Sequence, residues 1–217
     1  MFTKLATVVV AAVAMMAGLF VTQAAASGGI AMGGGSGIIL AGRATCTLTT
    51  IGHDRSGSLV GITAGHCGNP GASVVAERFR GAGVIGRMVA KNSALDYAVI
   101  EFDPGRVVPV RHVGGTTITG IGSPVSFPAL ICKEGRTTGH TCGWAYGDVF
   151  ASNQTWGQVC VREGDSGGPV TVGTTLVGMI NAYLSQACVG PSVGTNMNAV
   201  LADLRARGGA GAGYRPI

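Results

Sequence analysis

The stretch Gly164-Asp165-Ser166-Gly167-Gly168-Pro169 decides the fold once it is placed beside two stretches earlier in the chain. These are Thr63-Ala64-Gly65-His66-Cys67 and Leu95-Asp96-Tyr97-Ala98-Val99-Ile100. Together the three stretches supply a histidine, an aspartate and a serine, in that order. A serine hydroxyl is a poor nucleophile until a histidine takes its proton and a carboxylate orients that histidine. The pattern therefore predicts acyl transfer by an activated serine.

Each residue of this set has a predicted role. Ser166 is the candidate nucleophile, His66 is the general base and then the general acid, and Asp96 is the orienting carboxylate. The glycines around Ser166 permit a tight turn and let a substrate carbonyl approach the backbone closely. The backbone N–H groups of Gly164 and Ser166 are therefore the candidate oxyanion hole.

Other histidines and acids in the chain fit these roles less well. His53, His112 and His140 lack a comparable setting, so they are interpreted as surface or packing residues. Asp103 precedes a proline, and Asp148 lies in a glycine-rich loop. An ordinary turn or a structural histidine would explain any one motif alone, but not the three motifs together.

The three stretches resemble the secreted trypsin-like serine peptidases of the chymotrypsin fold, most closely their bacterial streptogrisin and alpha-lytic branch. The segment from Cys132 to Cys142 matches the loop pattern C-x-x-G-x-T-T-G-x-x-C of that branch. Cys160 lies six residues before Ser166, and Cys188 follows the next long apolar run. The resemblance covers residues 42–208. It implies an all-β fold of two packed six-stranded antiparallel β-barrels with a C-terminal helix and the site between the barrels.

Short apolar runs bounded by turn-forming residues recur along the chain, as expected for the strands of a sandwich or barrel. Near the C-terminus, Met197, Val200, Leu201 and Leu204 recur at helical spacing, which predicts a helix that stops at a glycine. The expected division is a signal peptide (1–26), a glycine-rich leader or short prosegment (27–41), a first barrel (42–113), a second barrel (114–195), the helix (196–207) and a disordered tail (208–217).

The N-terminus has the pattern of a secretory signal peptide. Lys4 precedes an unbroken apolar run from Leu5 to Val21, and small residues follow before the cleavage site expected after Ala26. A retained membrane anchor is the alternative interpretation. Cleavage would leave 191 of the 217 residues, enough for one peptidase unit. We therefore expect bacterial export, an extracellular location and no stable membrane association after cleavage.

Composition agrees with an exported β-protein. Charged residues make up 12% of the chain, against about 25% in average globular chains, and there are 38 glycines. Without residues 1–26, 14 basic and 10 acidic residues remain, a net charge of +4. The basic residues are scattered rather than clustered with aromatic residues, so we expect no nucleic-acid partner. The expected partner is a peptide or protein substrate, and the expected state is a monomer.

The cysteines form an even set, which in an exported chain predicts disulfides, with 15 possible connectivities. A metal site is disfavoured because the chain has no C-x-x-C pair, and no metal or organic cofactor is expected. The resemblance implies one connectivity, Cys46 to Cys67, Cys132 to Cys142 and Cys160 to Cys188.

One departure from the family pattern concerns the support of the oxyanion hole. In this branch an arginine after the first cysteine of the C-x-x-G loop pairs with the aspartate before the nucleophile, here Asp165. This chain has Lys133 at that position, which supplies the charge but not a bidentate fork, so we expect a less rigid loop. The alternative partner for Asp165 is an N-terminal amine created by cleavage near Ile38-Ile39.

A second departure concerns specificity. The family's pocket edge usually reads Ser-Gly-Gly, and the ungapped alignment places Asn181, Ala182 and Tyr183 there. These are the candidate substrate-binding residues. In this alignment Asn181 can hydrogen-bond near Asp96, and Tyr183 crowds the pocket and favours small side chains. A register error is the alternative, since strand boundaries are read to only about ±2 to 4 residues.

The sequence therefore predicts a secreted serine endopeptidase with Ser166, His66 and Asp96 as its triad. Two alternatives stay open. One is a secreted pseudo-protease that only binds a partner, because Lys133 and Tyr183 could impair the oxyanion loop or the pocket. The other is an esterase that uses the same acyl-enzyme.

Overall fold

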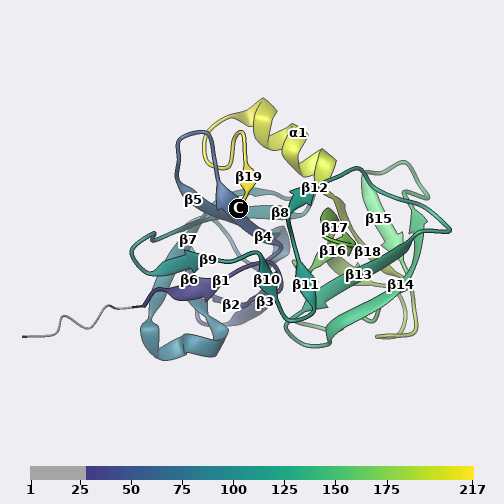
Figure 1. Cartoon of the computed structure of the whole chain (residues 1–217), viewed down its shortest axis with the longest axis horizontal. Helices are drawn as coiled ribbons and strands as arrows, with labels where there is room; N and C mark the ends of the chain where they lie inside the picture. Colours follow the sequence, from purple (N-terminus) through teal and green to yellow (C-terminus); the bar gives the residue numbers. More distant parts are fainter. Residues whose placement is uncertain (1–27) are drawn as a thin grey trace, which may run out of the picture.

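The computed structural model describes residues 28–217. The predicted signal peptide, its cleavage site and the first residue of the predicted leader lie outside the described residues. Within residues 28–217, no helix is long and apolar enough to cross a membrane. Two β-sheet bodies lie side by side, and helix α1 (Met197–Arg207) lies along the top of the view (Figure 1).

The first body is an eight-stranded sheet with the order β19-β4-β5-β8-β7-β6-β2-β3. Its central strand β5 has six buried residues, and its neighbour β8 has five, because both carry almost continuous apolar runs. The bounds are β2 (Gly37–Leu40), β3 (Ala44–Thr47), β4 (Thr50–His53), β5 (Leu59–Ala64), β6 (Ser73–Ala76), β7 (Val84–Asn92), β8 (Tyr97–Phe102) and β19 (Arg215–Pro216).

The second body closes on itself. Its sheet order is β12-β17-β16-β13-β14-β15-β18, and β17 also pairs with β18, so six antiparallel strands form a closed ring. Strand β12 pairs with β17 in parallel and is not part of this ring. The bounds are β12 (Gly120–Ile121), β13 (Leu130–Gly135), β14 (Gly139–Gly147), β15 (Gln154–Gly157), β16 (Pro169–Val172), β17 (Thr175–Tyr183) and β18 (Ser192–Asn196).

The predicted all-β architecture of two barrel-like bodies and a C-terminal helix is confirmed, with one difference in detail. The second body is the closed six-stranded barrel, whereas the first is an open sheet enlarged by the edge strands β3 and β19. Between the bodies the chain runs through β9 (Val107–Pro109), β10 (His112–Val113) and β11 (Thr116–Thr117).

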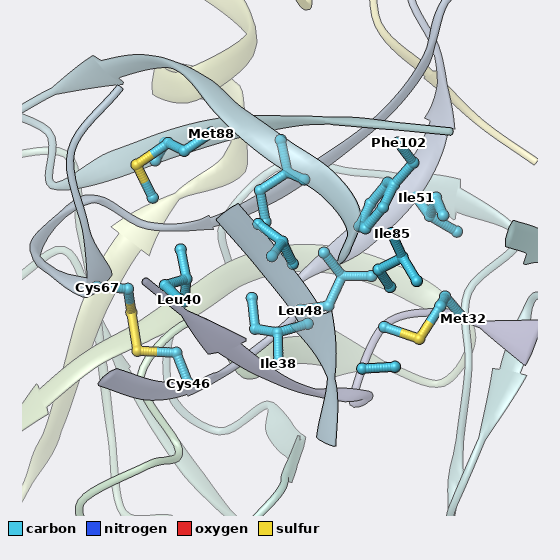
Figure 2. Packing of buried hydrophobic residues seen from close by; sticks show 14 of the residues in the cluster. Met32, Ile38, Leu40, Cys46, Leu48, Ile51, Cys67, Ile85, Met88 and Phe102 are labelled. Atoms are coloured by element: carbon cyan, nitrogen blue, oxygen red, sulfur yellow. A yellow bond between two sulfur atoms is a disulfide. The ribbon is translucent and has the colours of Figure 1, made fainter. Parts of the chain in front are cut away.

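Three buried clusters hold the fold together. The first fills the interior of the first body around Ile38, Leu48 and Phe102 (Figure 2). The third fills the second barrel around Ile131 and Val170. The second cluster joins strands of both bodies to α1, and its members are Val60, Ile62, Tyr97, Val99, Ile118, Leu176, Met179, Met197, Val200, Leu204 and Tyr214. The two bodies are therefore packed against each other through a shared apolar core.

The three disulfides pair as the family resemblance implied, and that prediction is confirmed. Cys46 in β3 bonds to Cys67 in the 3₁₀ helix η1 (Gly65–Cys67). Cys132 and Cys142 face each other across β13 and β14. Cys160 bonds to Cys188.

The segment predicted as a leader instead forms part of the first body. Strand β1 (Ile30–Met32) pairs with β9, and β2 lies between β3 and β6 with Ile38 and Leu40 buried. A Cβ atom on Gly34 would lie 2.5 Å from the carbonyl oxygen of Thr49. The glycine run that suggested mobility is thus required by close backbone packing.

The tail predicted to be disordered is also ordered in the structure. Strand β19 pairs with β4, and Tyr214 is buried with its hydroxyl 2.9 Å from Oγ1 of Thr50. Gly208 and Gly211 have φ of 69° and 82°, conformations that glycine adopts at low cost. These glycines form turns that return the chain to the first body.

Replacing Tyr214 tests whether the tail belongs to the fold. We expect Tyr214→Ala to lower the free energy of unfolding by about 3 to 5 kcal/mol, because a large side chain leaves the shared core. Urea unfolding of the disulfide-intact protein measures this, with the exposed Arg205→Ala as control. Equal midpoints for Tyr214→Ala and the unsubstituted protein would mean that the tail does not pack.

Candidate active site

His66 and Asp96 are brought together by the register of two buried strands. Ala64 at the end of β5 pairs with Tyr97 at the start of β8, so the residues just outside this pair meet. His66 Nδ1 lies 2.7 Å from Asp96 Oδ2, and the backbone N–H of His66 donates to Asp96 Oδ1 at 2.7 Å. The carboxylate therefore holds both the ring and the backbone of His66.

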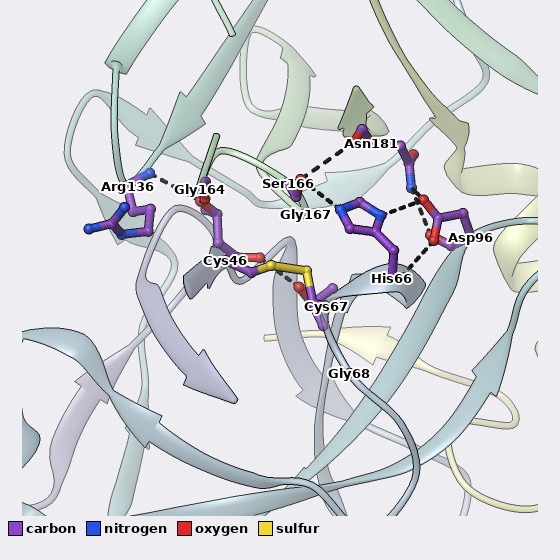
Figure 3. The surroundings of a disulfide bond; sticks show 12 residues. Cys46, His66, Cys67, Gly68, Asp96, Arg136, Gly164, Ser166, Gly167 and Asn181 are labelled. Atoms are coloured by element: carbon purple, nitrogen blue, oxygen red, sulfur yellow. Dashed lines mark hydrogen bonds and ion pairs between the residues drawn. A yellow bond between two sulfur atoms is a disulfide. The ribbon is translucent and has the colours of Figure 1, made fainter. Parts of the chain in front are cut away.

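Ser166 approaches from the second barrel and completes a continuous chain of contacts (Figure 3). Its Oγ lies 2.8 Å from His66 Nε2. The Cys46–Cys67 disulfide lies beside the histidine and fixes the short helix η1 that carries it. The side chain of His66 is 48% exposed, so a substrate can reach it.

Asn181 braces Asp96 from the second barrel. Its Nδ2 donates to both the carbonyl oxygen and Oδ2 of Asp96, each at 2.7 Å. Thr195 supports this arrangement, since its hydroxyl lies 3.1 Å from Asn181 Oδ1 and donates to the carbonyl of Leu95 at 2.6 Å. Sequence reasoning placed Asn181 near Asp96 but missed Thr195, which belongs to no recognisable motif.

These contacts set the protonation of Asp96. Burial by itself raises the pKa of the carboxyl, but the hydrogen bond and charge of His66 and the hydrogen bond from Asn181 outweigh it. The pKa of Asp96 is therefore held below its ordinary value. The group stays ionised at neutral pH and can accept from His66 Nδ1–H.

The segment of residues 163–168, here called the oxyanion loop, presents unpaired backbone donors on both sides of Asp165. Within residues 28–217, the N–H groups of Gly164 and Ser166 donate to no protein acceptor. The N–H groups of Asp165, Gly167 and Gly168 are all paired. Two neighbouring unpaired N–H groups beside a serine hydroxyl are suited to binding a developing oxyanion.

Asp165 anchors the oxyanion loop beneath Ser166. Its side chain and that of Lys133 are fully buried, with Nζ and Oδ2 3.3 Å apart. Asp165 also accepts hydrogen bonds from the backbone N–H groups of Thr137, Thr138 and Arg162 at 2.9 to 3.1 Å, and from the Thr138 hydroxyl at 2.6 Å. Lys133 thus occupies the position where the family pattern has arginine, and threonine hydroxyl and backbone donors supply the further hydrogen bonds.

The pKa of Asp165 is lowered by the same contacts. Burial by itself raises it, but the hydrogen bond from Thr138, the positive charge of Lys133 and the backbone hydrogen bonds lower it below the ordinary value. The alternative partner, an amine created near Ile38, is not used. Ile38 lies inside β2, paired on both sides.

The remaining predicted residues lie at the end of β17. Ala182 is exposed, and Tyr183 is half-buried against the cluster that includes Val161 and Ile180.

The sulfurs of Cys132 and Cys142 and a nitrogen of His140 lie close enough together to suggest a metal site. The two sulfurs are bonded to each other in a disulfide, so neither is a free ligand.

No family model matches the chain. Solved structures do resemble it. The chymotrypsin of Cellulomonas bogoriensis is 26% identical with a TM-score of 0.66, over 87% of this chain and 99% of that one. Thermobifida fusca protease A is 23% identical with a TM-score of 0.66, and a Nocardiopsis protease is 23% identical with a TM-score of 0.64. Each of these two matches covers 80% of this chain and 96% of the other.

These neighbours are bacterial serine proteases of the chymotrypsin fold, so the predicted resemblance is confirmed. At 23% identity, the two proteases establish the shared fold. The more similar chymotrypsin, matched over nearly its whole length, supports the predicted class of enzyme, a serine endopeptidase.

A pH series tests the contribution of Asp165 to stability. Because its pKa in the folded state lies below the unfolded value of about 3.9, its ionisation stabilises the fold above that pH. This contribution is lost as pH falls through the folded-state pKa. We expect Asp165→Asn to be much less stable than the unsubstituted protein at pH 7, with the difference narrowing below about pH 4.

Urea unfolding at pH 7, 5 and 3 measures this difference. Asp103→Asn, at an exposed carboxylate, is the matched control. If the stability difference between Asp165→Asn and the unsubstituted protein is the same at pH 7 and pH 3, the ionised Asp165 carboxylate does not stabilise the fold as argued.

Proposed function

We propose that this chain is a serine endopeptidase that hydrolyses peptide bonds through an acyl-enzyme, with Ser166, His66 and Asp96 as its triad. One observation carries the proposal. Ser166 Oγ, His66 and Asp96 form a chain of contacts of 2.8 and 2.7 Å beside two unpaired backbone N–H groups. This arrangement fits the geometric requirements for nucleophile, base, orienting group and oxyanion hole.

In the first half of the reaction, Ser166 Oγ attacks the carbonyl carbon of the peptide bond while its proton passes to His66 Nε2. The carbonyl oxygen becomes negatively charged and accepts hydrogen bonds from the N–H groups of Gly164 and Ser166. His66 then gives its proton to the leaving nitrogen, the C–N bond breaks, and the amine departs. The acyl group remains on Ser166.

In the second half, water attacks the acyl carbon and passes a proton to His66. The bond to Ser166 Oγ breaks, the serine regains the proton, and the carboxylic acid product leaves. Asp96 stays ionised throughout. Its role is to hold His66 with Nδ1 protonated and Nε2 facing the serine, and Asn181 limits its movement.

The end of β17 supports an extended peptide as substrate. Residues 182 and 183 pair with β18 along one edge. Next to them, the Asn181 carbonyl lies 3.4 Å from Ser166 Oγ, so this end of the strand runs alongside the nucleophile. A substrate backbone added along the strand in antiparallel fashion would bring its scissile carbonyl to the serine.

We extend the proposal to export through a cleaved signal peptide, supported by the pattern of residues 1–26 and by three disulfides. The pseudo-protease alternative rested partly on Lys133. The ion pair of Lys133 with Asp165 supports the peptidase over this alternative.

Two substitutions test the triad. We expect Ser166→Ala to lower kcat by about 10⁶-fold and Asp96→Asn by about 10⁴-fold, because the first removes the nucleophile and the second the correct histidine tautomer. Turnover of a panel of peptide anilides measures both. The matched control Asp103→Asn should keep full activity. Undiminished turnover in folded Ser166→Ala would disprove the assignment.

The pocket edge generates a prediction about specificity. Tyr183 packs against the second-barrel cluster two residues after Asn181, whose carbonyl lies 3.4 Å from Ser166 Oγ. It should therefore leave room only for small side chains at the cleaved residue. We expect cleavage after Ala to be faster than after Phe, and Tyr183→Gly to raise the Phe-to-Ala ratio of kcat/KM by at least about 10-fold. The exposed Tyr146→Gly serves as control. Equal rates after Ala and Phe in the unsubstituted protein would refute crowding by Tyr183.

A further inference from the structure

The orientation of an oxyanion-hole donor depends on the carbonyl of the same peptide unit. In a trans peptide the N–H and C=O bonds point in opposite directions. The Gly164 N–H belongs to the peptide unit whose carbonyl is that of Glu163. Whatever holds the Glu163 oxygen outward therefore turns the Gly164 N–H toward the substrate.

Two threonine hydroxyls from outside the oxyanion loop hold the peptide units on either side of Gly164. Thr137 Oγ1 donates to the Glu163 carbonyl at 2.7 Å, and Thr47 Oγ1 donates to the Gly164 carbonyl at 2.9 Å. Thr47 comes from the first body and Thr137 from the hairpin between β13 and β14. By contrast, the Asp165 carbonyl is held within the loop by the N–H of Gly168 at 2.8 Å.

Gly164 needs such restraint because its backbone is intrinsically free. It has φ of 94°, a conformation in the region that favours glycine. Without the outer hydrogen bonds, the peptide unit between Glu163 and Gly164 could rotate. Its carbonyl oxygen would then point into the space that the substrate oxyanion must occupy, and one donor would be lost.

Arg136 fixes the direction in which both hydroxyls donate. Its Nη1 donates to Thr137 Oγ1 at 3.0 Å, and its backbone N–H donates to Thr47 Oγ1 at 3.1 Å. A hydroxyl that accepts from a group with only donors keeps its single proton for another acceptor. Each threonine proton is thereby directed to a carbonyl of the oxyanion loop.

Glu77 holds Arg136 in place. The Arg136 Nε donates to Glu77 Oε2 at 2.6 Å, and Nη2 pairs with Oε1 of the same carboxylate. This bidentate pair fixes the plane of the guanidinium group. Figure 3 shows Arg136 beside Gly164. A Cβ atom placed on Gly164 would lie 2.6 Å from Arg136 Nη1, so the contact is close.

We infer that Thr137 and Thr47 are positioning residues that hold the Gly164 N–H in its oxyanion-binding orientation, with Arg136 directing both hydroxyls. This inference rests on the proposed peptidase function. Neither threonine touches the reacting atoms. Thr137 is exposed, so water can partly replace its hydroxyl, whereas Thr47 is fully buried and has no such replacement.

Isosteric substitutions test the inference. Thr137→Val should lower kcat by about 10-fold and Thr47→Val by up to about 100-fold, which at most reaches the lower end of the 10²- to 10³-fold loss typical of removing a donor outright. KM should change less than about threefold, because the substrate strand is untouched. Thr137→Ser and Thr47→Ser, which keep the hydroxyl, should retain kcat within about threefold. Thr119→Val, at an exposed hydroxyl pair away from the site, is the control.

A second readout separates positioning from general stability. A peptide aldehyde forms a hemiacetal with Ser166 whose oxygen occupies the oxyanion hole, so its affinity should fall in parallel with kcat. Loss of affinity in the valine variants and its recovery in the serine variants would support the inference. If Thr47→Val does not fold, Thr137→Val and Thr137→Ser decide the question.

The outcomes distinguish this inference from the proposed function. If the unsubstituted protein neither cleaves peptides nor binds the aldehyde, the proposed function fails. If the unsubstituted protein is active and Thr137→Val keeps both kcat and aldehyde affinity within about threefold, the positioning role is overturned. Equal losses in Thr137→Val and Thr137→Ser would also overturn it, because the hydroxyl would then not matter.

Discussion

The buried carboxylate of Asp165 is the constraint on which the site depends. A charge with no solvent access is costly unless it is paired and hydrogen-bonded, and Asp165 meets this requirement through Lys133, Thr138 and three backbone N–H groups. Because these donors come largely from the hairpin of β13 and β14, the chain immediately before Ser166 cannot move without breaking several bonds at once. Ser166 therefore follows directly after a firmly held residue.

The second requirement is that the two β-sheet bodies are placed precisely enough for hydrogen bonds to form between them. The shared core around Tyr97, Met179 and Tyr214 packs them together, and the pairing of Ala64 with Tyr97 brings His66 to Asp96. Hydrogen bonds between the two bodies then hold the site residues in place. The Thr47 N–H donates to the Ser166 carbonyl at 2.8 Å, and Asn181 Nδ2 donates to Asp96. Each body thus carries part of the site and positions the part carried by the other.

The short motifs around His66, Asp96 and Ser166 are specific in combination, so they predicted which residues meet at the site. The family resemblance that these motifs carry implied the fold and the disulfide pairing. The sequence did not predict that residues 30–40 and 208–217 pack into the fold. Their glycines suggested mobility, yet Gly34 permits a close backbone approach and Gly211 forms a turn. Thr47 and Thr195 were also missed, since a threonine that donates to a distant segment leaves no local pattern. Thr137 lies in the T-T pair of the quoted loop pattern, but the pattern assigned it no role.

The central claim is that the folded chain activates Ser166, and fluorophosphonate labelling tests it most directly. The reagent reacts with a serine whose oxygen is made nucleophilic by a neighbouring base, and it requires no knowledge of the substrate. The purified, disulfide-intact protein should be labelled, the modified peptide should contain Ser166, and Ser166→Ala should abolish the signal. No labelling of a protein shown to be folded would contradict the account and favour a binding protein that has kept the fold without the chemistry.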